Sequence, residues 1–375
     1  MSERKEYTIG EICSRFSSGK SIKASQISAE GLYPVYGGNG LRGFTDTFNF
    51  DGECSIIGRQ GAYCGNVRYF KGKAFMTEHA IVAVVNENHN NGYVSNLLSM
   101  MNLAQYQGQS AQPGLSVSTL SKITIKLPDL ATQEQCFNVL NLIDQKIQIN
   151  NQINQELEAM AKTLYDYWFV QFDFPDQNGK PYKSSGGKMV YHPELKREIP
   201  EGWGVEKLSY FLTIKNGKDH KHLQDGKFAV YGSGGIMRMV TDYLYSGESI
   251  LFPRKGTLNN VMYVNEKFWT VDTMFYSEVN KNNSALYVFY SVKDIDFNKL
   301  NTGTGVPSMT SSILYDLNII VPEENILEKF NTVVKRNYET IKLNNIQNQE
   351  LIQLRDWLLP MLMNGQVKVE KSSCR

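Results

Sequence analysis

Three polar loops in the first third of the chain carry side chains that could read DNA bases. They span residues 36–42, 59–66 and 107–118, and they are rich in Arg, Gln, Asn and Ser. These side chains match the hydrogen-bonding groups that base edges present in the major groove. The alternative is that the loops only cap a β-rich fold, and composition alone leaves both interpretations open.

Signatures of catalysis are weak or missing in the sequence. Gly19-Lys20-Ser21 resembles the end of a phosphate-binding loop, but Ser14 stands where that loop needs Gly. His220-Lys221-His222 could hold a metal ion on one face of a strand, yet no carboxylate or Cys cluster accompanies it, and a solvated loop is the simpler interpretation. The sequence contains no Asn-Pro-Pro or Asp-Pro-Pro motif of the kind that would indicate adenine methylation. We therefore expect a binding protein with no catalytic residue, no metal ligand and no cofactor of its own.

The polar loops recur in the second half of the chain at a nearly constant spacing. The matched segments are 34–40 with 229–235, 59–61 with 254–256, and 66–67 with 260–261. Such self-similarity indicates an internal duplication. Residues kept in both copies should fold the loops or bind phosphate, and residues that differ should distinguish bases. The kept pairs include Arg59/Arg254, Gly37/Gly232 and Gly61/Gly256, and the differing pairs include Asn39/Gly234, Gln60/Lys255 and Tyr63/Leu258.

The candidate DNA-binding residues come from these loops in both copies. In the first copy they are Tyr36, Asn39, Arg42, Arg59, Gln60, Tyr63, Asn66, Gln109 and Gln112. In the second copy they are Tyr231, Ser233, Arg238, Arg254, Lys255, Asn259, Asn260, Thr302 and Thr304. Residues 1–129 hold twelve Lys and Arg against ten Asp and Glu, so each copy is close to neutral. Affinity for DNA must then come from clustered cations or from the charge of a partner.

Two long helices are predicted to position these loops. Residues 132–168 and 323–362 place apolar side chains on a heptad frame, and both frames are interrupted by two Asn residues. A buried Asn in such a seam costs stability and fixes the register, which indicates that the two helices pair with each other. The pairing residues are Leu140, Ile143, Ile147, Asn150, Asn154 and Leu157 with Val334, Ile341, Asn344, Asn348 and Leu351. Pro360 should kink or end the second helix.

The chain divides into six segments on this interpretation. They are a globular segment (1–129), a long helix (130–170), a Pro- and Gly-rich connector without a core of its own (171–204), a second globular segment (205–321), a second long helix (322–364) and a tail (365–375). The runs CSIIG, NVRYF, AIVAVV and ITIKLP predict strands in the first segment, and residues 93–105 predict a helix. We expect an α+β protein in which two repeated mixed α/β domains are separated by a pair of long antiparallel coiled-coil helices, related by a pseudo-twofold axis.

Composition limits the cellular setting. The formal charge is +1, and the five cysteines are scattered without a Cys-x-x-Cys pair, which indicates a reducing compartment. No apolar run approaches the length of a membrane span, and the first residues are polar. We expect a soluble cytoplasmic protein. The aromatic residues Tyr165, Tyr167, Trp168 and Phe169 either anchor a partner or pack against the second globular segment, and we favour packing.

Residues 160–203 resemble the central region of the DNA specificity subunits of type I restriction-modification systems. The approach to the first long helix, Leu127-Pro128-Asp129-Leu130, is also similar to that family, and Val321-Pro322 before the second helix fits less well. The resemblance covers the whole chain, including the repeat. It implies two target recognition domains, each reading one half of a bipartite DNA sequence, and two antiparallel helices that set the gap between the halves.

The resemblance also implies partners and their cofactors. Two methyltransferase subunits would dock on the helices, and translocating restriction subunits would complete the enzyme. S-adenosylmethionine, ATP and Mg²⁺ would be used by those partners and not by this chain. Two alternatives from other classes stay open: a stand-alone DNA methylase or nuclease, and a coiled-coil scaffold without DNA readout. Transfer of methyl groups or nicking by the isolated chain would favour the first.

Overall fold

We describe the protein from a computed structural model that covers residues 3–108, 114–303 and 305–369. The chain forms two compact units. Unit 1 consists of Met1–Asn150 with Ile346–Arg375, and unit 2 consists of Asn151–Asn345. Each unit therefore combines one globular segment with part of each long helix. In the described part of the chain, no helix has the length and apolar character that crossing a membrane requires.

Unit 1 is built on one six-stranded sheet with the strand order β2-β7-β5-β6-β3-β4. Its elements are β1 (Lys5–Thr8), α1 (Ile9–Ile12), β2 (Cys13–Ser18), η1 (Ala24–Gln26), β3 (Tyr33–Gly37), β4 (Gly40–Thr45), β5 (Phe50–Gly58), β6 (Val67–Met76), β7 (Ala80–Val85), α2 (Asn91–Met100), η2 (Leu103–Tyr106), α3 (Val117–Leu120) and β8 (Thr124–Leu127). Only β3 and β6 pair in parallel within the sheet, and β1 pairs with β8 in a separate ladder. The four predicted strand runs lie in β5, β6, β7 and β8, and the predicted helix is α2.

Unit 2 repeats the order of the sheet strands and of the α-helices between them, and it adds η3 and a two-stranded β9–β10 ladder. Its elements are η3 (Asp166–Val170), β9 (Met189–His192), β10 (Arg197–Pro200), β11 (Gly204–Lys207), α5 (Leu208–Phe211), β12 (Leu212–Asn216), β13 (Asp225–Gly232), β14 (Gly235–Val240), β15 (Tyr245–Pro253), β16 (Met262–Thr270), β17 (Met274–Val279), α6 (Ala285–Lys293), η4 (Phe297–Leu300), α7 (Ser311–Tyr315) and β18 (Asn318–Val321). The sheet order is β12-β17-β15-β16-β13-β14, with β13 parallel to β16. The predicted internal duplication is confirmed by this matching order.

Two long helices, α4 (Leu130–Tyr165) and α8 (Glu324–Asn364), contribute to both units. The start of α4 is capped by Asp129, whose carboxylate accepts a hydrogen bond from the Thr132 amide at 2.9 Å. Hydrogen bonds from Thr132 hold the pKa of that carboxyl below its usual range. α8 continues past Pro360 to Asn364, which is where the second long helix was expected to end, so the proline does not end the helix. Burial of Leu362 and Met363 in the core of unit 1 offsets the hydrogen bond that proline cannot make.

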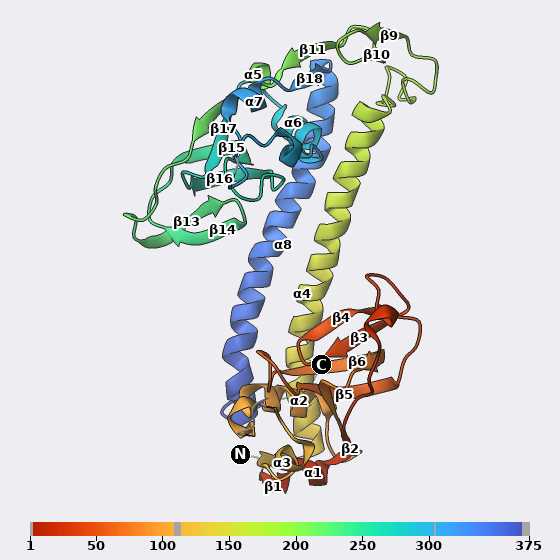
Figure 1. The fold of residues 1–375 in the computed structure, drawn as a ribbon, viewed down its shortest axis with the longest axis vertical. Helices are drawn as coiled ribbons and strands as arrows, with labels where there is room; N and C mark the ends of the chain where they lie inside the picture. Colours follow the sequence, from red (N-terminus) through yellow and green to blue (C-terminus); the bar gives the residue numbers. More distant parts are fainter. Residues whose placement is uncertain (1–2, 109–113, 304, 370–375) are drawn as a thin grey trace, which may run out of the picture. The chain divides into compact units, whose positions relative to one another are not determined.

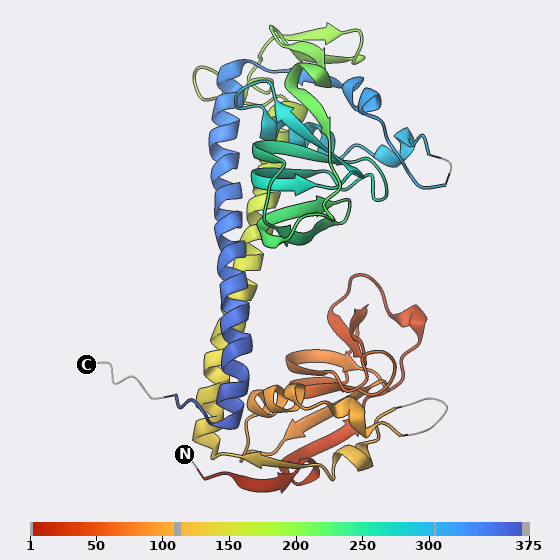
Figure 2. The same ribbon diagram turned by 90° about the vertical axis from the view of Figure 1, so that its left-hand side faces the viewer.

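Within each unit, α4 and α8 lie side by side and run antiparallel (Figures 1 and 2). In unit 1, Asn150 donates to the Asn348 side chain at 2.9 Å, and the Arg355 guanidinium lies 2.9 Å from Asp144. In unit 2, the Asn344 amide donates to Asn154 at 2.8 Å. The interrupting Asn residues therefore meet one another in the seam. The other pairing candidates are buried or half-buried: Leu140, Ile143, Ile147, Leu157, Val334, Ile341 and Leu351.

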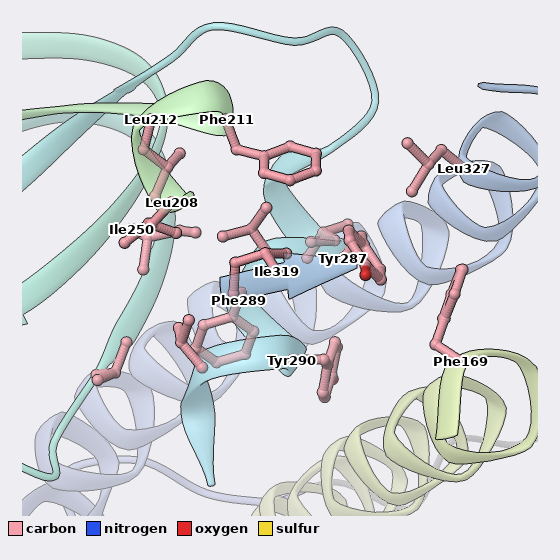
Figure 3. Close-up of a cluster of buried hydrophobic side chains, with 14 of the residues drawn as sticks. Phe169, Leu208, Phe211, Leu212, Ile250, Tyr287, Phe289, Tyr290, Ile319 and Leu327 are labelled. Atoms are coloured by element: carbon pink, nitrogen blue, oxygen red, sulfur yellow. The ribbon is translucent and has the colours of Figure 1, made fainter. Parts of the chain in front are cut away.

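The core of unit 2 gathers aromatic rings from η3, α6 and α8. Figure 3 shows Phe169 of η3 with Tyr287, Phe289 and Tyr290 of α6. The Phe169 ring centroid lies 4.6 Å from that of Tyr287 and 5.0 Å from that of Phe330. Trp168 is also buried there and Tyr165 packs against this core, so the predicted packing role of these residues is confirmed, whereas Tyr167 is exposed.

The connector belongs to the same core, which the sequence did not predict. Phe172, Phe174, Ile199 and Trp203 are buried in the core of unit 2. The Phe174 ring stacks on Trp203 with the centroids 4.8 Å apart. Phe172 has a φ of +66°, an uncommon value for a residue with a side chain. The segment has no core of its own, as expected, but it completes the core of its neighbour.

Candidate nucleic-acid interface

In unit 1, the loop after β5 (residues 59–66) meets two other loops. The Arg59 amide donates to the His79 carbonyl at 2.9 Å, and the Arg59 carbonyl accepts from the Leu115 amide at 2.9 Å. Gln60 forms an isolated bridge with Gly114. The β3–β4 turn closes on the same loop, because a Cβ on Gly38 would lie 3.3 Å from the Gln60 carbonyl oxygen. The loop after β5, the two loops that it meets and the β3–β4 turn form a surface that we name the rim of unit 1.

Unit 2 builds an equivalent rim from the loop after β15. The Arg254 amide donates to the Thr273 carbonyl at 2.8 Å, and the Arg254 carbonyl accepts from the Met309 amide at 2.9 Å. Lys255 forms the bridge with Ser308 that Gln60 forms with Gly114. The backbone frame of the rim is thus conserved within the molecule, while the side chains that project from it differ.

Two kept glycines and a kept Gly-Lys pair support this frame. Gly61 and Gly256 have φ values of +82° and +92°, a region that residues with side chains rarely adopt. A Cβ on Gly19 would lie 2.2 Å from the Met76 carbonyl oxygen, and a Cβ on Gly217 would lie 2.0 Å from that of Val271. The similarity of Gly19-Lys20-Ser21 to a phosphate loop therefore reflects tight strand packing.

Exposed cations follow those glycines in both units. Lys20 and Lys218 are exposed, and their amides donate to the carbonyls of Met76 and Thr270, each at 2.9 Å. The Arg59 guanidinium donates to Ser18 at 3.4 Å, which brings Arg59 close to Lys20. Neither lysine was among the predicted candidates. The recurrence of Gly-Lys at equivalent places in the two copies is the sequence signal that identifies them.

The candidates of unit 1 lie mainly at the surface. Asn39, Arg42, Gln60, Tyr63 and Asn66 are exposed, and Arg59 is half-buried. Tyr36 is half-buried, with its ring centroid 5.1 Å from that of Phe70. Burial raises the pKa of Tyr36, and the positive charge of Arg68 opposes that rise. Gln109 and Gln112 lie outside the described residues.

Four candidates of unit 2 are already paired inside the unit. The Tyr231 hydroxyl donates to Glu266 at 2.9 Å, and the ring is buried. Arg238 forms an ion pair with Asp225 at 2.8 Å. The Asn259 amide donates to Asp296 at 3.1 Å, and the Asn260 amide donates to the Ser233 carbonyl at 2.8 Å. A ligand that bound these side chains would have to compete with the existing partners.

The remaining candidates of unit 2 are more accessible. Arg254 and Lys255 are exposed, and the Arg254 guanidinium lies 5.8 Å from the Phe275 ring centroid. Ser233 is half-buried, whereas Thr302 is exposed and its hydroxyl donates to the Ser308 carbonyl at 3.2 Å. Thr304 lies outside the described residues. Arg254 and Lys255 are therefore the cationic groups that the rim of unit 2 offers to a ligand.

The predicted contrast between Tyr63 and Leu258 was wrong. Tyr63 is 47 % exposed, whereas Leu258 is fully buried in the core of unit 2. The second copy is one residue shorter between Gly256 and Asn260 than the first is between Gly61 and Asn66. Cys64, which is buried, occupies the place that Leu258 takes in unit 2. Tyr63 therefore has no counterpart, and only the first rim presents an aromatic side chain there.

The residues that the structure describes contain no group of three His, Cys, Asp or Glu side chains that could hold a metal ion. The His222 ring packs against Trp269, with the centroids 5.9 Å apart. The polar groups that project from each rim are instead guanidinium, ammonium, amide and hydroxyl groups. These groups suit phosphates and base edges.

Comparisons with known proteins find one family. A family model described as "Type I restriction modification DNA specificity domain" matches residues 1–159 and 200–353. The type I restriction enzyme MjaIX specificity subunit of Methanocaldococcus jannaschii is 30% identical over 298 residues, which cover 72% of this chain and 66% of that protein. The type I restriction enzyme EcoprrI specificity subunit of Escherichia coli is 40% identical over 146 residues, covering 38% of this chain and 36% of that protein.

These matches span about two thirds of the length of the first relative and about a third of the second. The fold is similar to a solved structure over nearly the whole chain. The crystal structure of a type I restriction-modification system S subunit from M. genitalium has a TM-score of 0.67 and 17% sequence identity, and the match covers 96% of each chain.

Proposed function

The chain belongs to the family of type I restriction-modification DNA specificity domains, and from that membership we propose that it is the subunit that recognises a bipartite DNA target. It would direct methyltransferase and restriction subunits to that target and would carry no catalytic group. The observation that carries the proposal is that one rim frame is built twice, with different side chains on each copy. Two recognition domains carried by one pair of helices would bind two half-sites of DNA at a defined spacing.

The proposed partners are double-stranded DNA, two methyltransferase subunits and the restriction subunits. S-adenosylmethionine, ATP and Mg²⁺ would be bound by those partners. Each globular segment is close to neutral, so the partners would supply much of the charge that holds DNA. A chromosomal DNA target implies that the protein works in the cytoplasm.

A methylation map tests this proposal. The chain is co-expressed with its methyltransferase subunit in a host that lacks adenine methylation, and the DNA is sequenced with reads that detect modified bases. We expect methylated adenines in one split motif with a fixed unspecified gap. A complex that assembles and binds S-adenosylmethionine but methylates no site would contradict the proposal. That result would favour the coiled-coil scaffold that the sequence also allows.

A further inference from the structure

The tip of the β3–β4 hairpin in unit 1 is flanked by two arginines. Gly37 and Gly40 are direct partners across the hairpin, so their Cβ positions point to the same face. A Cβ on Gly37 would lie 2.8 Å from Cδ of Arg42, and a Cβ on Gly40 would lie 2.8 Å from Cζ of Arg68. The two glycines therefore leave the space that both arginine side chains occupy on that face.

Arg42 owes its direction to a β-bulge. The register passes from Val35 opposite Gly43 to Tyr36 opposite Leu41, so Arg42 is the extra residue of the bulge. A bulge turns one side chain out of the regular alternation of the strand. Here the redirected side chain folds back along the tip towards Gly37.

Arg68 differs from the other cations on its strand. Lys71 lies 2.9 Å from Glu53, and Lys73 lies 3.9 Å from Asp51, each across the β5–β6 ladder. Arg68 stands opposite Ile56, which offers no charge. No carboxylate of the described residues forms an ion pair with Arg42 or Arg68, and both side chains are exposed. Two guanidinium groups thus keep their full hydrogen-bonding capacity at the hairpin tip.

Unit 2 has the same hairpin and β-bulge, but methionines stand at the positions of both arginines. The register passes from Val230 opposite Arg238 to Tyr231 opposite Ile236, so Met237 is the bulge residue. A Cβ on Gly232 would lie 2.5 Å from the Met237 sulfur. Met262 stands opposite Leu251, as Arg68 stands opposite Ile56. Met237 is exposed, whereas Met262 is half-buried against a core cluster of unit 2, and nothing lies within 4 Å of a Cβ placed on Gly235. The hairpin tip of unit 1 therefore carries two guanidinium groups, and the equivalent tip of unit 2 carries neither.

We propose that Arg42 and Arg68 read guanine in the half-target bound by unit 1, and that unit 2 has no equivalent readout. This inference rests on the function proposed above. A guanidinium group donates two parallel hydrogen bonds from a planar fork to O6 and N7 of guanine, and an ammonium group donates to the same atoms without that fixed plane. Methionine at the equivalent places offers only apolar contact. The two half-targets are thus read by different chemistry from the same backbone frame.

The test uses the assembled methyltransferase complex and two double variants. Arg42→Lys with Arg68→Lys keeps the charge and removes the fork, and Arg42→Met with Arg68→Met copies unit 2. Both should lower the discrimination at G·C positions in one half-target, by about tenfold or more in the methionine variant, and should leave the other half-target unchanged. The matched control is Lys71→Met with Lys73→Met, which removes two cations from the same strand. It should leave the motif intact.

The outcomes separate this inference from the function on which it rests. A methionine variant that keeps the full motif in both halves overturns the assignment. So does an assembled variant that loses methylation at all sites, because the arginines would then bind DNA without regard to sequence. A wild-type complex without any split motif removes the proposed function and this inference together. Co-purification with the methyltransferase and an unchanged melting temperature show that each variant is folded.

Discussion

Gly61 and Gly256 give the two rims a backbone conformation that residues with a side chain rarely adopt. Their φ values of +82° and +92° lie where a Cβ meets the chain's own carbonyl oxygens. Nothing else lies within 4 Å of a Cβ placed on Gly61. At Gly61 the backbone conformation alone therefore explains the glycine, whereas a Cβ on Gly256 would also lie 2.9 Å from the Ser233 hydroxyl oxygen.

Substitution of Gly61 isolates that strain. Gly61→Ala should destabilise unit 1 by about 1–2 kcal/mol, because alanine pays the steric cost of positive φ. Native-state hydrogen exchange of the β5 amides measures the free energy of opening. Gly108→Ala is the control in the same unit, since its φ is not in the positive region and its nearest neighbour is 4.0 Å away. Equal effects of the two substitutions would contradict this account.

Arg59 and Gln60 are adjacent but should act differently on DNA. Arg59 is kept as Arg254, whereas Gln60 is replaced by Lys255. Arg59→Ala should weaken binding of the complex to all DNA sequences and lower the salt dependence of binding by about one phosphate contact. Gln60→Lys should alter the sequence preference within one half-target. Binding titrations against randomised half-targets at several salt concentrations measure both quantities.

The opposite pattern would refute this division of roles. It would consist of an Arg59→Ala variant with altered preference beside a Gln60→Lys variant with unchanged preference. Arg254→Ala serves as the matched control, because it should reduce affinity to a similar extent through the other unit.

At the scale of elements, the helices and most strands of the first copy could be predicted from periodicity. Runs such as AIVAVV are apolar throughout because β7 is flanked by strands on both sides and buried on both faces. The connector was harder because Phe172, Phe174 and Trp203 are isolated among prolines and glycines, and no period links them. Their common burial arises only from tertiary packing.

The same limit applies to the candidate site. Arg59, Gln60 and their repeats could be found by matching the two copies. Arg68 could not, because it lies in a run that reads as an ordinary strand, and its closeness to Gly40, which belongs to another strand, arises only from tertiary packing. Tyr231 was predicted to contact a ligand, but a polar aromatic residue next to glycines can also point into the core. Loop patterns do not encode which way it turns.

The hydrogen-bonded Asn side chains between α4 and α8 lead to a prediction about the stability of the helix pair. Asn150→Leu should cost about 1–3 kcal/mol, because the buried Asn348 side-chain oxygen loses the hydrogen bond that Asn150 donates. The double variant Asn150→Leu with Asn348→Leu should recover most of that stability, since both polar groups are removed together. Urea unfolding followed by helical circular dichroism measures the two changes. Additive losses in the double variant would mean that the two amides do not depend on each other.

At the scale of the whole molecule, each long helix belongs to two folding units. In α4, residues 130–150 pack with unit 1 and residues 151–165 pack with unit 2. If α4 opened as one body, its amide hydrogens would exchange with solvent at similar rates along its whole length. Division between two cores predicts two levels of protection along one helix, because cooperative units open separately.

Removing one aromatic ring of the connector tests whether α4 is divided between the two units. Phe174→Ala should destabilise unit 2 by about 3–5 kcal/mol, because it empties a buried site against Trp203. Hydrogen exchange should then accelerate in residues 151–165 of α4, while residues 130–150 keep their protection. Ile57→Ala in the core of unit 1 is the reciprocal control, with the opposite halves affected. Uniform acceleration along α4 in either variant would show that the helix opens as one body.

The discontinuity of unit 1 also sets an order of events during synthesis. Its last stretch begins at Ile346, after the whole of unit 2 (Asn151–Asn345) has been translated. At about 5–20 residues per second, that stretch leaves the ribosome roughly 10–40 s after Asn150. Leu362 and Met363, which complete the buried core of unit 1, are among the last residues to arrive. The core of the unit whose sheet is translated first is therefore completed last, and in the interval part of its apolar surface stays exposed.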